Sequence, residues 1–296
     1  MAAARSDAPL DVVALDRWWD FQHPAASEAT FRRELEKLPP DSSAQIELIT
    51  QIARAQGLQR RFGDAHVTLD QVEGKLPGRP PRVSVRYLLE RGRVFNSSQQ
   101  AERAVPLFHA ALDQARAAGE DFLAIDAAHM LGIATPPGER LDWNLEAVKL
   151  TEQASDARSK RWLASLYNNI GWTYHERGDY AHALEYFEKA LPAWRARGDP
   201  VAIRAARWSI ARSLRSLGRY DDALAIQTAL LVETDKAGVV DGYVYEELGE
   251  LALARGDAAA AKPWFGKAYA ALAGDASLAA DEPARLDRLR RLGSGQ

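Results

Sequence analysis

The clearest pattern of hydrophobic and polar positions along the chain lies in residues 163–199. Tyr167, Ile170 and Tyr174 recur at helical spacing and share one face with Gly171, which is small enough to let a second helix lie close. The tripeptide at 177–179, Arg-Gly-Asp, interrupts this run. A second apolar face at helical spacing follows, made of Tyr180, Ala183, Leu184, Phe187 and Ala190. The pattern predicts two antiparallel helices joined by a short turn.

The order of residue types in these two helices resembles the signature of the tetratricopeptide repeat (TPR). The first helix carries an aromatic residue, then Ile-Gly and then Tyr, at positions 167, 170–171 and 174. The second helix carries Ala, Phe and Ala at positions 183, 187 and 190. A TPR hairpin cannot bury its apolar face alone, because the neighbouring hairpin has to cover that face. The resemblance therefore implies that the chain holds further copies.

The small residue that lets the two helices approach recurs along the chain and phases the repeats. Its equivalents, separated by 39, 40, 39, 40 and 38 residues, are Ala53, Gly92, Gly132, Gly171, Ala211 and Gly249. Twelve residues after each of them lie Ala65, Ala104, Asn144, Ala183, Ala223 and Ala261. These registers predict six repeats of about 39 residues, longer than the usual length of about 34. Together with the resemblance they imply an all-α, right-handed superhelical solenoid of about six TPR-like hairpins, capped at both ends.

The segments on either side of the repeats are expected to be those caps. Residues 1–43 should hold a loose tail up to about residue 9, an aromatic segment and a helix beginning near Pro24. The aromatic segment, Trp-Trp-Asp-Phe at 18–21, should cover the apolar end of the solenoid or fold back across it, with partner binding as the alternative. Residues 44–273 form the repeats. Residues 274–296 should be a small-residue loop, a capping helix from Pro283 with solvated arginines, and a frayed end.

Composition narrows the classes of function. The net charge of −3 over 296 residues shows no basic excess for nucleic acid, and the chain has no cysteine for disulfides, thiolate zinc sites or thiol nucleophiles. No apolar run reaches the roughly 18 residues of a membrane span. The N-terminus lacks the continuous apolar core of a signal peptide, so a cytoplasmic location is the default expectation.

Catalytic and cofactor signatures are missing from the sequence. GxxxxGK[ST], GxGxxG, HExxH and GxSxG do not occur, and the six histidines never lie at i, i+4. We therefore expect no enzyme, no cofactor and no metal. An enzyme stays the third alternative, with His129 and His175 as its only candidate groups.

In a TPR superhelix the first helix of each hairpin lines the concave face. By resemblance, the positions three before, one after and four after the small residue point inward. In this chain they are Thr50, Arg54, Gly57, Leu89, Arg93, Asn96, His129, Ile133, Pro136, Asn168, Trp172, His175, Trp208, Arg212, Arg215, Glu246, Glu250 and Leu253. The positions two before the small residue add Asn169 and Glu247.

The later inward positions combine tryptophans, amides and charges, and we expect them to bind a protein or peptide segment. The candidate binding residues are Asn168, Asn169, Trp172, His175, Trp208, Arg212, Arg215, Glu246 and Glu250. The two arginines would hold an acidic side chain or a C-terminal carboxylate, the tryptophans would supply apolar area, and the glutamates would make the groove bipolar. The alternative is structural: the tryptophans pack between helices, and Arg212 pairs with Glu246 or Glu250.

The function hypothesis is a non-enzymatic scaffold that holds a partner segment in its concave groove, with no nucleic-acid or membrane partner. It rests on analogy with the fold. The runner-up is a sensory or regulatory module that changes its superhelical pitch when it binds a signalling peptide. The sequence leaves open the partner, the oligomeric state and whether the chain's own N-terminus fills the groove.

Overall fold

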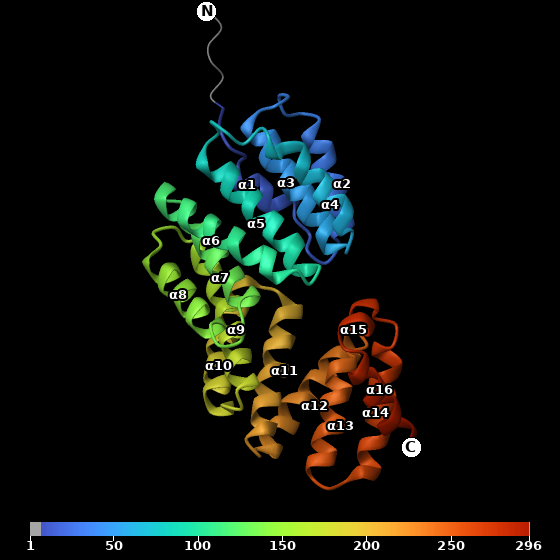
Figure 1. Cartoon of the computed structure of the whole chain (residues 1–296). Helices are drawn as coiled ribbons and strands as arrows, with labels where there is room; N and C mark the ends of the chain where they lie inside the picture. The colour runs from blue at the N-terminus through green and yellow to red at the C-terminus, as the bar shows by residue number, and fades with distance from the viewer. Residues whose placement is uncertain (1–6, 296) are drawn as a thin grey trace, which may run out of the picture. The chain divides into compact units, whose positions relative to one another are not determined.

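The computed structural model describes residues 7–295 and is all-α over that range, which confirms the predicted fold class (Figure 1). Those residues form sixteen α-helices and one short 3-10 helix, and none of them is in a strand. The chain divides into two compact units, which we call unit 1, up to Leu166, and unit 2, from Tyr167. The boundary falls inside α9 (Leu163–Glu176).

Unit 1 contains two N-terminal helices followed by three helical hairpins. The N-terminal helices are α1 (Val12–Trp18) and α2 (Pro24–Leu35). The hairpins are α3 (Ser43–Leu58) with α4 (Phe62–Glu73), α5 (Pro81–Ser97) with α6 (Ala101–Ala118), and α7 (Asp121–Ala134) with α8 (Arg140–Gln153). The 3-10 helix η1 (Ser159–Trp162) and the first residues of α9 follow, up to Leu166. The second helix of one hairpin packs on the first helix of the next, as in a solenoid.

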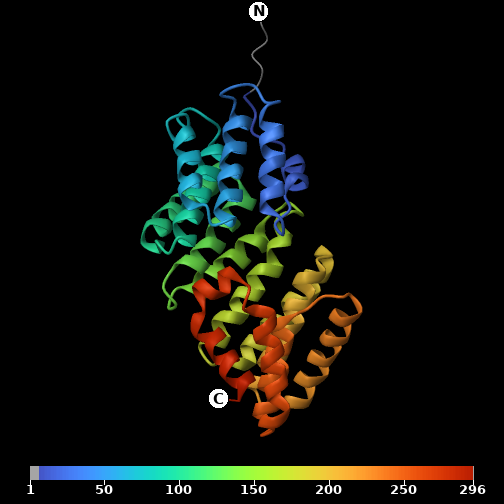
Figure 2. The same ribbon diagram turned by 90° about the vertical axis from the view of Figure 1, so that its right-hand side faces the viewer.

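Unit 2 begins with the later part of α9 and repeats the same arrangement. Its helices are α10 (Tyr180–Arg197), α11 (Pro200–Ser216), α12 (Tyr220–Lys236), α13 (Gly242–Ala254), α14 (Ala258–Leu272), α15 (Ala276–Asp281) and α16 (Pro283–Ser294). The view turned by 90° shows paired helices lying side by side along their lengths (Figure 2). The last helix, α16, covers α14.

Small residues let the two helices of a hairpin touch, as the phasing of the sequence predicts. A Cβ on Gly92, Gly171 or Gly249 would come within about 3 Å of a ring atom of the phenylalanine sixteen residues later. These phenylalanines, Phe108, Phe187 and Phe265, are fully buried. In the third hairpin Gly132 faces the Asn144 side chain instead, and a Cβ added to Gly132 would lie 2.6 Å from the Asn144 Nδ2.

The turns inside the hairpins require a left-handed backbone conformation. Gly178, Gly218 and Gly256 adopt it with φ of 77°, 75° and 82°. The first two hairpins lack glycine there, and Arg60 and Gln99 take up φ of 60° and 63° instead. A side chain at positive φ is strained, so unit 1 holds its first two turns at a local cost that unit 2 avoids.

The described residues near the two ends, from Asp7 and up to Gly295, are more ordered than the sequence predicts. Residues 1–6 and Gln296 lie outside the described residues, but Asp7 is not loose, because it accepts hydrogen bonds from the Ser43 backbone and hydroxyl at 2.7 and 2.8 Å. The loop predicted at 274–280 is wrong, since Asp275 caps the short helix α15 and Leu278 is buried. The end predicted to fray from Gly293 is helical to Ser294, and Gly293 packs against the backbone of Gly266.

Candidate functional site

The candidate site in unit 2 centres on four side chains that we call the aromatic–arginine cluster: Trp172, His175, Trp208 and Arg212. The Trp172 and Trp208 rings lie 5.9 Å apart, on α9 and α11. The Arg212 guanidinium lies 5.7 Å from the Trp172 ring centroid and 5.3 Å from that of Trp208. A cation over aromatic faces is an attractive arrangement that leaves its N–H groups free to bind an anion.

Neighbouring helices hold both tryptophans. The Trp208 Nε1 donates a hydrogen bond to the Tyr243 carbonyl oxygen at 3.0 Å, and the two rings meet edge to face. Trp172 packs edge to face on Phe187 at 5.1 Å. The packing alternative is therefore correct for these contacts, yet both indoles stay only half-buried. The cluster combines fixed rings with accessible aromatic surface.

The two predicted arginines differ in what they bind. Arg215 pairs through Nε and Nη2 with Glu247, whose side chain is 1% exposed. Burial raises the pKa of Glu247 above its ordinary value, and Arg215 opposes that rise. Arg212 has no carboxylate within 4.0 Å among the described residues, and its buried Nε has no hydrogen-bond partner there. Only Arg212 is available to a ligand.

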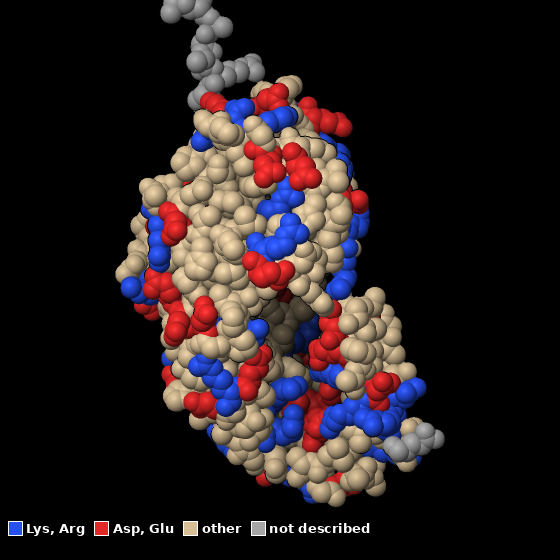
Figure 3. Space-filling view, in the orientation of Figure 1, with Lys and Arg blue, Asp and Glu red and all other residues tan. Residues whose placement is uncertain are grey.

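The acidic side chains of α13 are neutralised by α16. Arg285 donates to both carboxylate oxygens of Glu246, at 2.6 to 3.1 Å, and Arg288 pairs with Glu250. The prediction that the arginines of this helix face solvent is therefore wrong for Arg285 and Arg288. Figure 3 shows basic and acidic atoms interleaved where Figure 1 labels α13 and α16. Because both glutamates are paired, Glu246 and Glu250 do not supply the acidic end of a bipolar groove.

His175 extends the cluster along α9. It lies 5.3 Å from the Trp172 ring, and its Nε2 is 3.3 Å from the Ser216 hydroxyl. Burial, together with the positive charges of Arg212 and Arg215, lowers the pKa of His175 to about 4. At neutral pH the imidazole is therefore uncharged, and Arg212 is the cation of the cluster.

The two predicted amides lie one turn earlier on the same helix. Asn168 and Asn169 are half-buried, and the buried Nδ2 of Asn169 has no hydrogen-bond partner among the described residues. The Asn169 carbonyl accepts the Thr173 hydroxyl at 2.9 Å. These residues lie beside the cluster along α9, and no contact joins them to Arg212.

A pocket of about 490 Å³ adjoins Arg212. Its lining residues come from α11, α13 and the C-terminal helices: Arg212, Arg215, Glu246, Glu250, Glu282, Ala284, Arg285 and Arg288. Four arginines and three glutamates line it, and the buried Glu247 behind the lining pairs with Arg215, so Arg212 is the lining arginine that has no carboxylate partner among the described residues. The sequence analysis missed Arg285 and Arg288, because the helix that carries them was expected to cap apolar surface only.

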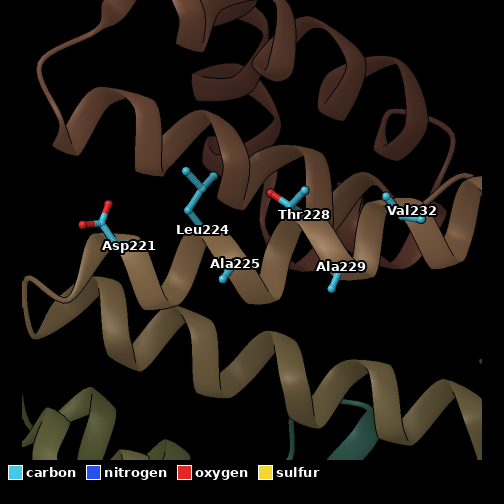
Figure 4. Close-up of a pocket in the computed structure, with 6 residues that line it drawn as sticks. All are labelled: Asp221, Leu224, Ala225, Thr228, Ala229 and Val232. Carbon is cyan, nitrogen blue, oxygen red and sulfur yellow. The ribbon is translucent and has the colours of Figure 1, made fainter.

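A second hollow, of about 620 Å³, runs along α12 (Figure 4). Its lining residues are Asp221, Leu224, Ala225, Thr228, Ala229 and Val232. These side chains are small or apolar except for one exposed carboxylate, so they offer little to recognise a specific ligand. Among residues 7–295, no group of three or more His, Asp or Glu could hold a metal, and no helix is long and apolar enough to cross a membrane.

Comparison with known proteins agrees with this architecture. The family model for the tetratricopeptide repeat matches residues 142–196. No curated protein sequence matches the chain significantly.

Solved structures of the same architecture are numerous but distant in sequence. A tetratricopeptide repeat protein from Parabacteroides merdae is similar over 96% of this chain and 97% of its own, with 14% identity and a TM-score of 0.54. Aspartyl phosphate phosphatase F from Bacillus subtilis is similar over 94% of this chain and 77% of its own, with 13% identity and a TM-score of 0.61.

A signal transduction ATPase from Pyrococcus horikoshii, which has a tetratricopeptide repeat sensor, reaches a TM-score of 0.68 at 14% identity. The similarity covers 95% of this chain and 43% of that protein. At these identities the likeness concerns the fold alone. The chain therefore contains tetratricopeptide repeat sequence at residues 142–196, within a fold of stacked helical hairpins in both units.

Proposed function

We propose that this chain is a non-enzymatic scaffold that binds a protein or peptide segment at the aromatic–arginine cluster of unit 2, with a carboxylate of the ligand at Arg212. The single observation that carries the proposal is that Arg212 has no carboxylate partner among the described residues. Arg215, Arg285 and Arg288 each have a glutamate partner, whereas Arg212 has none among the described residues. An arginine that packs against two indoles and has no carboxylate partner is suited to bind a carboxylate.

The surroundings of Arg212 support a peptide as the source of that carboxylate. Trp172 and Trp208 present half-buried aromatic surface, the kind that dominates binding energy at protein interfaces. The pocket next to Arg212 has room for a side chain or a chain end. Because Arg212 is the lining arginine without a carboxylate partner among the described residues, the pocket favours an acidic group there over a neutral one.

A peptide array tests this proposal. Each synthetic peptide ending in a free carboxylate, or carrying Asp or Glu, is paired with a twin in which that carboxylate is an amide. Binding of the full chain is followed by tryptophan fluorescence or polarisation. We expect the best binders to prefer the carboxylate by at least about tenfold, which is about 1.4 kcal/mol. Arg212→Gln should abolish this preference.

Lys267→Gln is the matched control for this experiment. Lys267 is also a cation over aromatic rings, at 4.6 Å from the Trp264 centroid, but it is exposed on α14 and lies outside the pocket. The control should keep the binding and the preference. Equal binding of carboxylate and amide twins, or unchanged binding by Arg212→Gln, would refute the proposed site.

A peptide-responsive regulatory module is the second candidate. The observation in its favour is that the boundary between the units falls inside α9, the helix that also carries Trp172 and His175. A ligand at the cluster therefore contacts a helix shared by both units. The similar ATPase from Pyrococcus horikoshii has its repeats in a sensor. Small-angle scattering with and without a bound peptide tests this role, and an unchanged radius of gyration counts against it.

A further inference from the structure

Unit 1 has a cluster of buried charges on its first helices, far less exposed than the cluster in unit 2. We call it the charged face, and it consists of Glu47, Arg54, Arg82, Arg86, Glu90, Arg93 and Asp126. Glu47 and Glu90 are fully buried, and Asp126 is 1% exposed. Arg93 bridges Glu90, at 3.0 Å, and Asp126, while Arg54 lies 3.7 Å from Glu90.

The charged face has more cation than anion. Arg82 and Arg86 pair with Glu47 at 3.0 and 3.4 Å, so its three carboxylates are shared among four arginines. One buried nitrogen on each of Arg82 and Arg86 has no hydrogen-bond partner among the described residues. Buried guanidinium groups without full pairing favour an acidic, hydrogen-bonding ligand.

The chain's own N-terminal segment, residues 10–21, occupies this face. The Leu10 backbone N–H donates to the buried Glu47 carboxylate at 2.9 Å, and the Trp19 indole donates to Gln51 at 3.1 Å. The Arg54 guanidinium lies 5.4 Å from the Trp19 ring and 5.3 Å from the Phe21 ring. These contacts place α1 beside α3 (Figure 1).

A further contact reaches the far end of unit 1. Asp16 accepts two hydrogen bonds from Arg158, at 2.8 and 3.0 Å, and lies 3.5 Å from Arg161. The segment thus runs from the first hairpin to the end of the third. With three Asp and one Arg the segment carries a charge of −2, and Asp16 pairs with Arg158 and Arg161, which lie outside the charged face.

The contacts of this segment are those of a bound peptide more than those of a core element. Only Leu10 and Leu15 of its twelve residues are buried, and Phe21 is 55% exposed. Leu10 and Leu15 pack with Phe31, Leu48 and Ile52. The other contacts are hydrogen bonds of Leu10 with Glu47, of Trp19 with Gln51 and of Asp20 with Ser27, the packing of Trp19 on Phe31 and Arg54, and the ion pairs of Asp16 with Arg158 and Arg161. Terminal segments with few buried apolar contacts detach at lower free energy than the core.

We infer that the charged face of unit 1 is a second peptide-binding site, which residues 10–21 occupy as an internal ligand. The partner it fits is a peptide with an acidic residue three positions before a tryptophan and a second aromatic two positions after it, as Asp16, Trp19 and Phe21 are spaced. Such a peptide binds when it displaces the internal segment. This inference concerns unit 1 and does not rest on the ligand proposed for Arg212.

A cleavable chain tests the inference. A site-specific protease sequence inserted between Phe21 and Pro24 allows the segment to be cut and removed by dilution. The probe is a fluorescent synthetic peptide of residues 7–22. We expect it to bind the cut chain and to bind the uncut chain at least about tenfold more weakly, because a tethered competitor acts at an effective concentration of about millimolar.

Peptide variants serve as matched controls, since they leave the protein unchanged. Replacing Asp16→Asn removes one charge at constant shape, and Trp19→Ala removes the stacked ring. Both should weaken binding to the cut chain by about tenfold or more. A scrambled peptide of the same composition should not bind. If the scrambled peptide binds equally, or the cut and folded chain binds no probe, the inference is wrong.

Hydrogen exchange of the uncut chain gives an independent answer, even if the cut chain unfolds. If the internal ligand detaches, the amides of α1 should exchange much faster than those of α3. The exchange rate of the α1 amides should also not depend on denaturant concentration, because only the segment opens. If α1 exchanges only when the whole of unit 1 unfolds, the segment is a fixed part of the fold and the inference is overturned.

Discussion

Arg215 and Arg212 lie one helical turn apart, yet the structure predicts different consequences for replacing them. Arg215→Ala leaves the Glu247 carboxylate, 1% exposed, without its cation. An unpaired buried carboxylate either stays charged at a high cost or takes up a proton. Protonation sets the upper limit of the loss. From the ordinary value of 4.5 to pH 7 that limit is about 3.4 kcal/mol, at about 1.4 kcal/mol per pH unit.

The loss of stability caused by Arg215→Ala should depend on pH for the same reason. Removing Arg215 raises the pKa of Glu247 further, so the unfolded chain ionises this carboxylate more readily than the folded one as pH rises. The folded state therefore loses more stability at pH 7 than at pH 5, where the upper limit falls to about 0.7 kcal/mol. We expect Arg215→Ala to destabilise unit 2 by up to about 3.4 kcal/mol at pH 7 and by no more than about 0.7 kcal/mol at pH 5.

Urea unfolding at both pH values, with hydrogen exchange of the α11 and α13 amides to localise the change to unit 2, measures this loss. Arg212→Gln is the control and should cost no more than about 1 kcal/mol, since only stacking on Trp172 and Trp208 is lost. Adding Glu247→Gln to Arg215→Ala should recover part of the stability at pH 7. An Arg215→Ala loss equal at pH 5 and pH 7 would show that Glu247 is not the cause.

Three further predictions concern stability. Gly171→Ala should destabilise by about 1–3 kcal/mol in urea unfolding, because its Cβ would lie 2.6 Å from the Phe187 ring, whereas Gly63→Ala, with nothing within 4 Å, should not destabilise. Gln99→Gly should raise the unfolding free energy by about 0.5–1 kcal/mol, since φ at this turn is 63°; an unchanged or lower stability contradicts the strain argument. Burial lowers the pKa of His129 to about 4 from 6.5, so the unfolded chain binds the extra proton first and stability falls between pH 6.5 and 4. His129→Leu should reduce this acid sensitivity by about 2 kcal/mol at pH 5, and an unchanged pH profile would exclude His129 as its source.

The hairpin architecture was predictable because it depends on local spacing. The positions of Gly92, Gly171 and Gly249 along the chain are the positions at which Phe108, Phe187 and Phe265 approach. Gly119, Gly198 and Gly238 follow the second helices of their hairpins and adopt the left-handed backbone conformation, with φ of 68°, 70° and 65°. Their places along the chain follow the same repeat spacing. Helical periodicity and glycine conformation act over a few residues, so a single sequence contains the information.

The individual binding residues were less predictable, because their partners are distant in sequence. Arg212 and Arg215 occupy equivalent-looking inward positions, and only the placement of Glu247 on α13 separates them. Glu246 and Glu250 look like free acidic groups until Arg285 and Arg288 pair with them from α16. No local pattern contains these pairings, since they arise where helices 32 to 39 residues apart in the chain come together.

The sequence by itself determined an all-α chain of TPR hairpins and the set of side chains on their first helices. Periodicity decides both, because the side-chain direction along a helix depends only on its register. Tertiary structure alone decided which of these charges are neutralised, that Arg212 lacks a carboxylate partner among the described residues, and that residues 10–21 lie on the charged face of unit 1. Ion pairing and burial depend on which distant helices meet, and hydrophobic patterning leaves the choice of those partners undetermined.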